Sequence, residues 1–235
     1  MDVEELYRRY AASERDFPGV DLSHADLNID KVGYPEELEP GKNDLSGINF
    51  SGANLRMANL SYVNLSGANL SDAQLYCAQL AEANLSGANL RNANLSSAEL
   101  GRIDVSGADL SGAILDGTDL EYANLSRANL SGASIAEGML AGIDLSGSNL
   151  SNAHFVESAL CYANLTKGCL RDTTFYEPLL VGANLTNVDL SEAIVSLDGA
   201  DIDRITGAIV CNTTMPDGSI RNDHCQRACH SRELI

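Results

Sequence analysis

A five-residue period dominates this chain and limits the folds that are open to it. Leu, Phe, Ile or Val stands at every fifth position from Leu45 to Val195, which makes 31 consecutive positions without an exception. Ala lies two places before 18 of these residues, and Asn or Asp directly precedes 19 of them. A period of five matches neither the 3.6 residues of a helical turn nor the alternation of a long strand. We therefore interpret the unit as a very short extended segment followed by a corner.

Side chains alternate along an extended segment, so the large residue and the Ala point one way while the Asn and the following Ser point the other. Gly often ends the unit, and Gly tolerates the backbone dihedrals of a tight turn. Repetition of this unit winds the chain into a coil whose interior is filled by Leu and Ala.

The number of sides of the coil follows from residues that recur at a longer interval. Asn or Asp occupies all eight positions of the series Asp44, Asn64, Asn84, Asp104, Asn124, Asp144, Asn164 and Asn184. Ser or Thr stands two places after each of them, whereas a step of fifteen gives no such regularity. Twenty residues per coil mean four segments per coil. The sequence thus predicts an all-β solenoid, a four-sided β-helix about 40 Å long at the usual strand spacing.

The pentad SGANL, found at residues 51–55, 66–70 and 86–90, resembles the pentapeptide-repeat family. The resemblance spans Leu45 to Val195 and implies a right-handed quadrilateral β-helix. The opening MDVEELYRRYAASERDF and the closing GAIVCNTTMPDGSI are also similar to the cyanobacterial HetL-like subgroup, which implies protein contact rather than catalysis. The Cys-containing tail departs from that subgroup, so the resemblance does not extend to a shared partner.

Five regions follow from the repeat and its interruptions. Residues 1–16 form an N-terminal helical cap, since an apolar face recurs at helical spacing within 2–13. Residues 17–32 form a first coil, 33–43 an inserted loop and 44–197 the main β-helix. Residues 198–235 hold an irregular last coil and the tail, whose closing segment is a candidate second helical cap. The insert has two Pro and three Glu, which indicates an exposed loop, either a phase-changing spacer or a partner contact.

Charge and composition exclude several classes of function. The chain carries 33 acidic and 15 basic residues, for a formal charge of -18, which argues against direct nucleic-acid binding. No apolar run is long enough to cross a membrane, and the charged start lacks the core of a signal peptide, so we expect a cytoplasmic protein. Phosphate-binding loops, HExxH and nucleophile elbows are missing. We predict neither an enzyme nor a cofactor.

The tail raises a question of redox or metal chemistry. Cys225 and Cys229 would share one face of a helix, and Cys211 lies upstream. Because the paired Cys-x2-Cys spacing of zinc sites is absent, no metal site is predicted, although His224 and His230 lie close by. A disulfide between Cys211 and one tail cysteine is one interpretation, and free thiols are the other. We expect the cysteines within the repeats to stay reduced.

The twenty-residue period also assigns each outward residue to a side. We number the sides by their first large residues: Leu45 for the first, Phe50 for the second, Leu55 for the third and Leu60 for the fourth. On the first two sides, Asn or Asp precedes the large residue in 15 of 16 places, which predicts flat polar ladders. On the other two sides the last coils are apolar.

We therefore predict a partner-binding surface on the third and fourth sides, with acid beside it. Its residues are Tyr122, Met139, Val156, Tyr162, Tyr176, Leu179 and Val181, with the column Glu137, Glu157 and Glu177. Contiguous exposed apolar surface typically marks an interaction site, and stacked carboxylates favour a positive partner. The alternatives are that the tail covers these residues, or that drifted repeats simply tolerate them.

The function expected from this pattern is a non-catalytic scaffold or regulator that binds another protein, as a monomer or as a dimer through an end cap. Some relatives in the resembled family imitate duplex DNA, which implies an alternative: a DNA mimic that binds a topoisomerase such as gyrase. Against it, residues 45–195 carry 15 acidic and 6 basic residues, a modest charge for their length. A redox- or metal-responsive tail is the third hypothesis.

Overall fold

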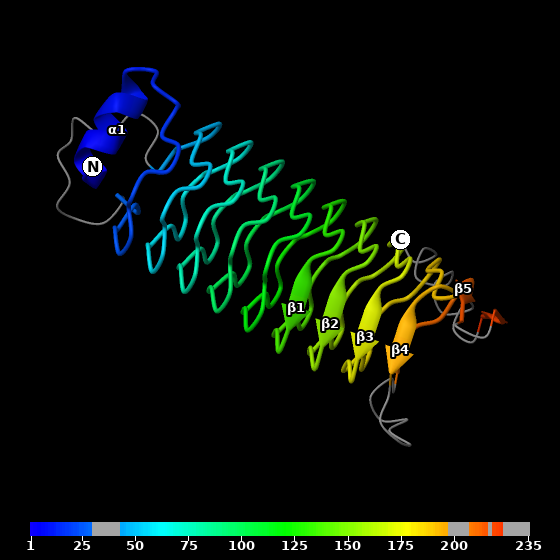
Figure 1. Cartoon of the computed structure of the whole chain (residues 1–235). Coiled ribbons are helices and arrows are strands. Elements are labelled where there is room, and N and C mark those ends of the chain that lie inside the picture. The colour runs from blue at the N-terminus through cyan, green and yellow to red at the C-terminus, as the bar shows by residue number, and fades with distance from the viewer. Residues whose placement is uncertain (30–42, 197–206, 216–217, 223–235) are drawn as a thin grey trace, which may run out of the picture.

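The structure, a computed structural model, describes residues 1–29, 43–196, 207–215 and 218–222. Figure 1 shows a helix at one end of a rod, followed by coils that stack one upon another along the rod axis. Parallel bridges join residues twenty apart, as in Asp44–Asn64 and Asn129–Asn149. The large residue of every pentad from Leu45 to Phe175 is buried. The four-sided β-helix with 20 residues per coil is therefore confirmed.

From Gly47 to Asn187, the corners impose the left-handed backbone conformation on the second residue after each large one. Gly meets this demand at Gly47 and Gly147, each with a φ of 66°. Other residue types are forced into the same region, including Asn92 at 55° and Arg127 at 60°. Because a side chain disfavours positive φ, the corner favours Gly, which explains why Gly is frequent in the pentad.

Side-chain amides link successive coils on the first and second sides. The Nδ2 of Asn129 donates to Oδ1 of Asp109 at 2.9 Å, and its own Oδ1 accepts from Nδ2 of Asn149 at 3.0 Å. The same Oδ1 accepts the backbone N–H of Ser131, which fixes the corner. One residue type thus serves both the turn and the stacking, which explains why Asn and Asp recur on these sides.

The N-terminal end is closed by helix α1 (Val3–Ala11), within the range expected for a cap. Asp2 begins the helix by accepting the backbone N–H of Glu5 at 2.8 Å, as an N-cap residue does. The hydroxyl of Tyr7 donates to the carbonyl of Leu27 at 2.8 Å, and Leu6 is fully buried. The helix therefore covers the first coil with its apolar face.

The first coil precedes an insertion of thirteen residues, since Asp16 and Asp26 bridge to residues 33 further along. The expected core residues Phe17, Leu22 and Leu27 are buried. The expected coil residue Val32 and most of the predicted loop 33–43 lie outside the described residues.

Asn43 was wrongly assigned to that exposed loop. It is buried, because its Oδ1 accepts the backbone N–H of Ile29 at 2.7 Å and its Nδ2 donates to Oδ1 of Asn28 at 2.9 Å. Asn43 therefore pins together the two ends of the insertion.

Four parallel strands of three residues each lie where the third side reaches its last four coils. They are β1 (Ser134–Ala136), β2 (His154–Val156), β3 (Thr174–Tyr176) and β4 (Ile194–Ser196). They form one parallel sheet in the order β1-β2-β3-β4, visible side by side in Figure 1. Beneath them, the rings of Phe155 and Phe175 stack at 5.0 Å. The candidate site lies beside this sheet.

The C-terminal end is bounded by a short antiparallel pair, β5 (Thr213–Thr214) and β6 (Ile220–Arg221). Thr214 also bridges to Asp189, so the hairpin continues the second side. The backbone N–H of Met215 donates to the carbonyl of Ser219 at 2.8 Å. The candidate C-terminal helical cap lies outside the described residues. None of the described helices is long and apolar enough to span a membrane.

Candidate interaction surface

The predicted partner-binding residues occupy two adjoining sides of the last coils. We call the apolar members of this set the apolar patch: Tyr122, Met139, Val156, Tyr162, Tyr176, Leu179 and Val181. Most are substantially exposed: Tyr122 by 64%, Met139 by 49%, Tyr162 by 71%, Tyr176 by 38% and Leu179 by 37%. Val156 and Val181 are half-buried.

The fourth-side part of the apolar patch is held in register by the coil stack. Parallel bridges join Met139 to Ala159 and Ala159 to Leu179, which places these three residues in one column. Ala159 is half-buried and small, and it lies between two larger exposed neighbours. The Ala159 side chain therefore extends less far outward than those of Met139 and Leu179. A second column of small residues, Ala141, Cys161 and Val181, runs beside the first.

The corner between the fourth and first sides, called the far corner below, carries two tyrosines. Each of them lies next to a glycine of the following coil. A Cβ on Gly142 would meet the Cδ1 of the Tyr122 ring at 2.7 Å, and one on Gly182 would meet that of Tyr162 at 2.6 Å. Real Cβ contacts are essentially never this short, so Gly at positions 142 and 182 leaves the space that the two rings occupy. Both tyrosines also adopt positive φ, 57° for Tyr122 and 59° for Tyr162, which is unfavourable for a bulky residue.

The other corner of the fourth side, where it meets the third side, carries the predicted carboxylates. Glu137, Glu157 and Glu177 have φ values of 55°, 51° and 48°, and the N–H of Glu137 donates to the carbonyl of Val156 at 2.8 Å. Glu137 and Glu157 are exposed, whereas Glu177 is half-buried and interacts elsewhere in the molecule.

This position corrects the expected layout, because the carboxylate column runs between the third and fourth sides. It separates Val156 and Tyr176 from Met139 and Leu179 instead of bordering them all. The fourth-side part of the apolar patch is consequently the continuous one. It has carboxylates along one corner and tyrosines along the other.

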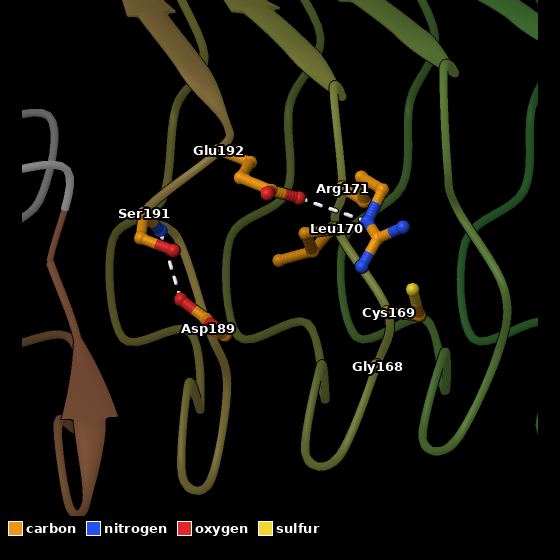
Figure 2. A pocket seen from close by; sticks show the side chains of 7 residues that line it. All are labelled: Gly168, Cys169, Leu170, Arg171, Asp189, Ser191 and Glu192. Atoms are coloured by element: carbon orange, nitrogen blue, oxygen red, sulfur yellow. Dashed lines mark hydrogen bonds and ion pairs between the residues drawn. The ribbon is translucent and has the colours of Figure 1, made fainter.

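A small hollow on the second side is a separate feature, shown in Figure 2. Its volume is about 110 Å³, and it opens where Cys169 replaces the ladder residue of that coil. Arg171 pairs with Glu192 across it, with Nε and Oε2 2.8 Å apart. The backbone N–H of Ser191 donates to Oδ1 of Asp189, which lowers the pKa of that carboxyl. Both members of the ion pair are exposed, so the hollow is a gap in the ladder rather than a binding pocket.

The cysteines divide into two groups. Cys77, Cys161 and Cys169 are free, as expected for thiols of the repeats. Cys211 is disulfide-bonded. Its candidate partners Cys225 and Cys229 lie outside the described residues, as do His224 and His230, so the pairing stays a prediction. Within the described residues, no group of three or more His, Cys, Asp or Glu could hold a metal.

Sequence reasoning missed the Tyr–Gly stacking at the far corner. Its signal is nevertheless present, because Tyr122 and Tyr162 each precede a Gly by twenty residues. Sequence reasoning also grouped the two sides into one surface, since it counted columns without placing the corner between them.

A profile of pentapeptide repeats matches the chain as eight copies, over residues 43–72, 73–112, 106–137 and 140–175. No curated protein matches. Among solved structures, the chain is similar to HetL, a pentapeptide repeat protein involved in heterocyst differentiation regulation from the cyanobacterium Nostoc sp. strain PCC 7120. The identity is 31%, over 94% of this chain and 100% of that chain, with a TM-score of 0.39.

Two further solved structures are similar over shorter spans. QnrB1, a plasmid-mediated fluoroquinolone resistance protein, shares 16% identity over 82% of this chain and 90% of that chain, with a TM-score of 0.39. Rfr23, a pentapeptide repeat protein from the cyanobacterium Cyanothece 51142, shares 25% identity over 70% of this chain and 95% of that chain, with a TM-score of 0.35.

Proposed function

This chain belongs to the pentapeptide-repeat family, and we propose that it is a non-catalytic interaction protein that binds another protein through the apolar patch. The observation that carries the proposal is the exposure of Met139 and Leu179 in one column of the fourth side of the β-helix. Exposed contiguous apolar surface commonly marks a protein contact, and Tyr is enriched at such contacts. Tyr122 and Tyr162 supply that residue type at the edge of the fourth side.

The rigidity of the fourth side supports this function. The N–H of Tyr162 donates to the carbonyl of Val181 at 2.8 Å, and the N–H of Leu160 donates to that of Leu179 at the same distance. Each coil is thereby tied to the next by its backbone. A surface that is ordered before binding loses little conformational entropy when a partner docks, which favours affinity.

Affinity capture with matched variants tests the proposal. The double substitution Met139→Ser and Leu179→Ser removes exposed apolar atoms without touching the core. Met57→Ser is the control, because Met57 is 50% exposed, about the same as Met139, but lies several coils away from the apolar patch. Circular dichroism establishes that every variant keeps its fold.

We expect the double variant to lose its partner while the Met57 variant retains it. The captured protein, once purified, is then titrated against both variants to give the change in affinity. Equal capture by the double variant and the unaltered chain would refute the proposal.

The DNA-mimic alternative rests on the formal charge of -18. A gyrase supercoiling assay distinguishes it, since a mimic inhibits the enzyme and the proposed interaction protein does not. Ladder carboxylates such as Asp104 and Asp109 accept hydrogen bonds from Asn side chains of the next coil, so their column has a structural reason. The proposal therefore assigns these acids to the fold rather than to a partner.

A further inference from the structure

Resting on the proposed function, we propose that the partner segment is an amphipathic α-helix that lies along the rod axis on the fourth side. Its Lys or Arg stripe faces Glu137 and Glu157, and its adjacent apolar stripe covers Met139, Ala159 and Leu179. Three observations lead to this partner chemistry: the charge around the fourth side, the spacing of its columns and the use of its backbone.

The first observation is charge: acidic residues surround the fourth side in the coils that carry Met139, Ala159 and Leu179. Asp119 and Glu121 stand in the coil before Met139. Glu137 and Glu157 lie at the corner between the third and fourth sides. Among the described residues from 114 to 181, the third and fourth sides and the corners that bound the fourth side hold no Lys or Arg. Glu137 and Glu157 occupy neighbouring coils about 4.8 Å apart, so they repel one another until a cation approaches. A basic partner relieves that repulsion.

Spacing decides the secondary structure of the partner. Successive coils present equivalent side chains about every 4.8 Å along the rod. One face of an α-helix presents side chains about every 5.4 Å, whereas a strand presents them about every 6.7 Å on one face. Over the three coils of Met139, Ala159 and Leu179, a helix departs from the columns by about 1 Å and a strand by about 4 Å. Only the helix stays in register with both the carboxylates and the apolar column.

The backbone of the fourth side argues against strand addition independently. The N–H of Met139 donates to Thr118 and that of Leu140 to Ala159, at 3.0 and 2.9 Å. The N–H of Ala159 donates to Gly138 at 3.0 Å. Strand addition requires an unpaired edge, and these backbone groups are already paired. The fourth side therefore offers a partner only its side chains, and side-chain contacts are how a surface recognises a helix.

The shape of the fourth side accommodates such a helix. Ala159 is the small residue between exposed Met139 and Leu179, so a large side chain of the partner would fit opposite it. Tyr122 and Tyr162 border the opposite edge of the fourth side, and their exposure leaves both rings available to the partner.

Designed peptides titrated against the full chain test the inference. The first peptide is a helix with Leu at helical spacing and an adjacent Arg stripe. The second contains the same residues with two central prolines that prevent a helix, and the third carries the Arg stripe opposite the Leu stripe. A fourth peptide copies residues 223–235.

Two charge variants make the titration specific. Glu137→Gln with Glu157→Gln removes two charges beside the fourth side, and Asp104→Asn with Asp144→Asn removes two from the first side. The ladder of the first side accepts Asn in place of Asp, so the control keeps its stacking.

We expect the first peptide to bind at least about tenfold more tightly than the second and third, and the Glu variant to lose about tenfold while the Asp variant loses less than about threefold. Equal losses in the two variants, equal binding of the proline peptide, or no saturable binding overturns the inference. Binding of the fourth peptide that depends on Met139 also overturns it, because the chain's own tail is then the occupant.

The partner captured in the preceding experiment separates this inference from the proposed function. If the Glu variant retains that partner while the Met139 and Leu179 variant loses it, the docking surface stands and the basic helix is refuted. If neither variant loses it, both fail.

Discussion

Gly142→Ala tests the packing of the far corner more directly than any substitution of a tyrosine. Gly142 has a φ of 68°, and an added Cβ would meet the Cδ1 and Cε1 atoms of Tyr122 at 2.7 and 2.8 Å. Gly132 is the matched control, because its φ is 69° and nothing lies within 4 Å of its Cβ position. The two sites therefore impose the same backbone strain and differ only in the ring.

The strain of placing Ala at positive φ costs about 1 kcal/mol at either site. The contact with the ring adds about 1–2 kcal/mol at Gly142, as overpacking does, before the ring turns away. We expect Gly142→Ala to lower the free energy of unfolding by about 2–3 kcal/mol and Gly132→Ala by about 1 kcal/mol. Urea denaturation measures both, provided that the slope of the transition is unchanged.

A double-substitution cycle assigns the excess to the ring. In a Tyr122→Ala background, Gly142→Ala should cost no more than Gly132→Ala does, because the clash has been removed. If the excess cost of Gly142→Ala persists in that background, or if the two glycines tolerate Ala equally in the unaltered chain, the close packing of the Tyr122 ring against Gly142 is refuted.

Three other substitutions examine the ladders, the carboxylates and the tail. Asn129→Ala should lower the free energy of unfolding by about 1–2 kcal/mol and Asn94→Ala by about half as much, since Asn129 joins three coils and Asn94 serves its own turn; equal urea midpoints would contradict this. The Ser191 N–H lowers the pKa of Asp189 in the folded chain, so its stabilisation is present above about pH 4 and is lost as the pH falls further. The stability difference from Asp189→Asn should accordingly shrink in acid, and a constant difference would contradict the pKa shift. Alkylation without reductant should leave Cys211 unlabelled, and its labelling under those conditions would contradict the disulfide.

The interior and the number of sides could be predicted because they depend on a repeated physical demand. Every coil must bury one large residue per side, so Leu45 and its successors mark the core at a fixed interval. The polar ladders were equally predictable, since the same Asn that links the coils also fixes the turn after it. Periodicity alone carries both kinds of information.

Features that occur once could not be predicted in the same way. Asn43 lies next to the insertion, and its burial depends on how residues 28 and 29 meet it across that insertion, which no repeat encodes. The division of the candidate surface by the carboxylates depends on where the chain turns. The five-residue period places the corner at Glu137. The apolar residues on both sides of that corner were nevertheless grouped into one surface because of their shared apolar character.

The coil itself gives no reason for the apolar residues of the fourth side. Met139 and Ala159 pair in the same parallel register as Asp119 and Met139, so the backbone stacks whether the outward residue is polar or apolar. Met139 gains little from folding because about half of it remains exposed, and the interior beneath it is already filled by Leu140. Burial stabilises only the apolar area that is removed from water, about 25 cal/mol for each Å². The remaining area of Met139 and Leu179 therefore becomes favourable only when another surface covers it, which is why a binding role accounts for these residues better than stability does.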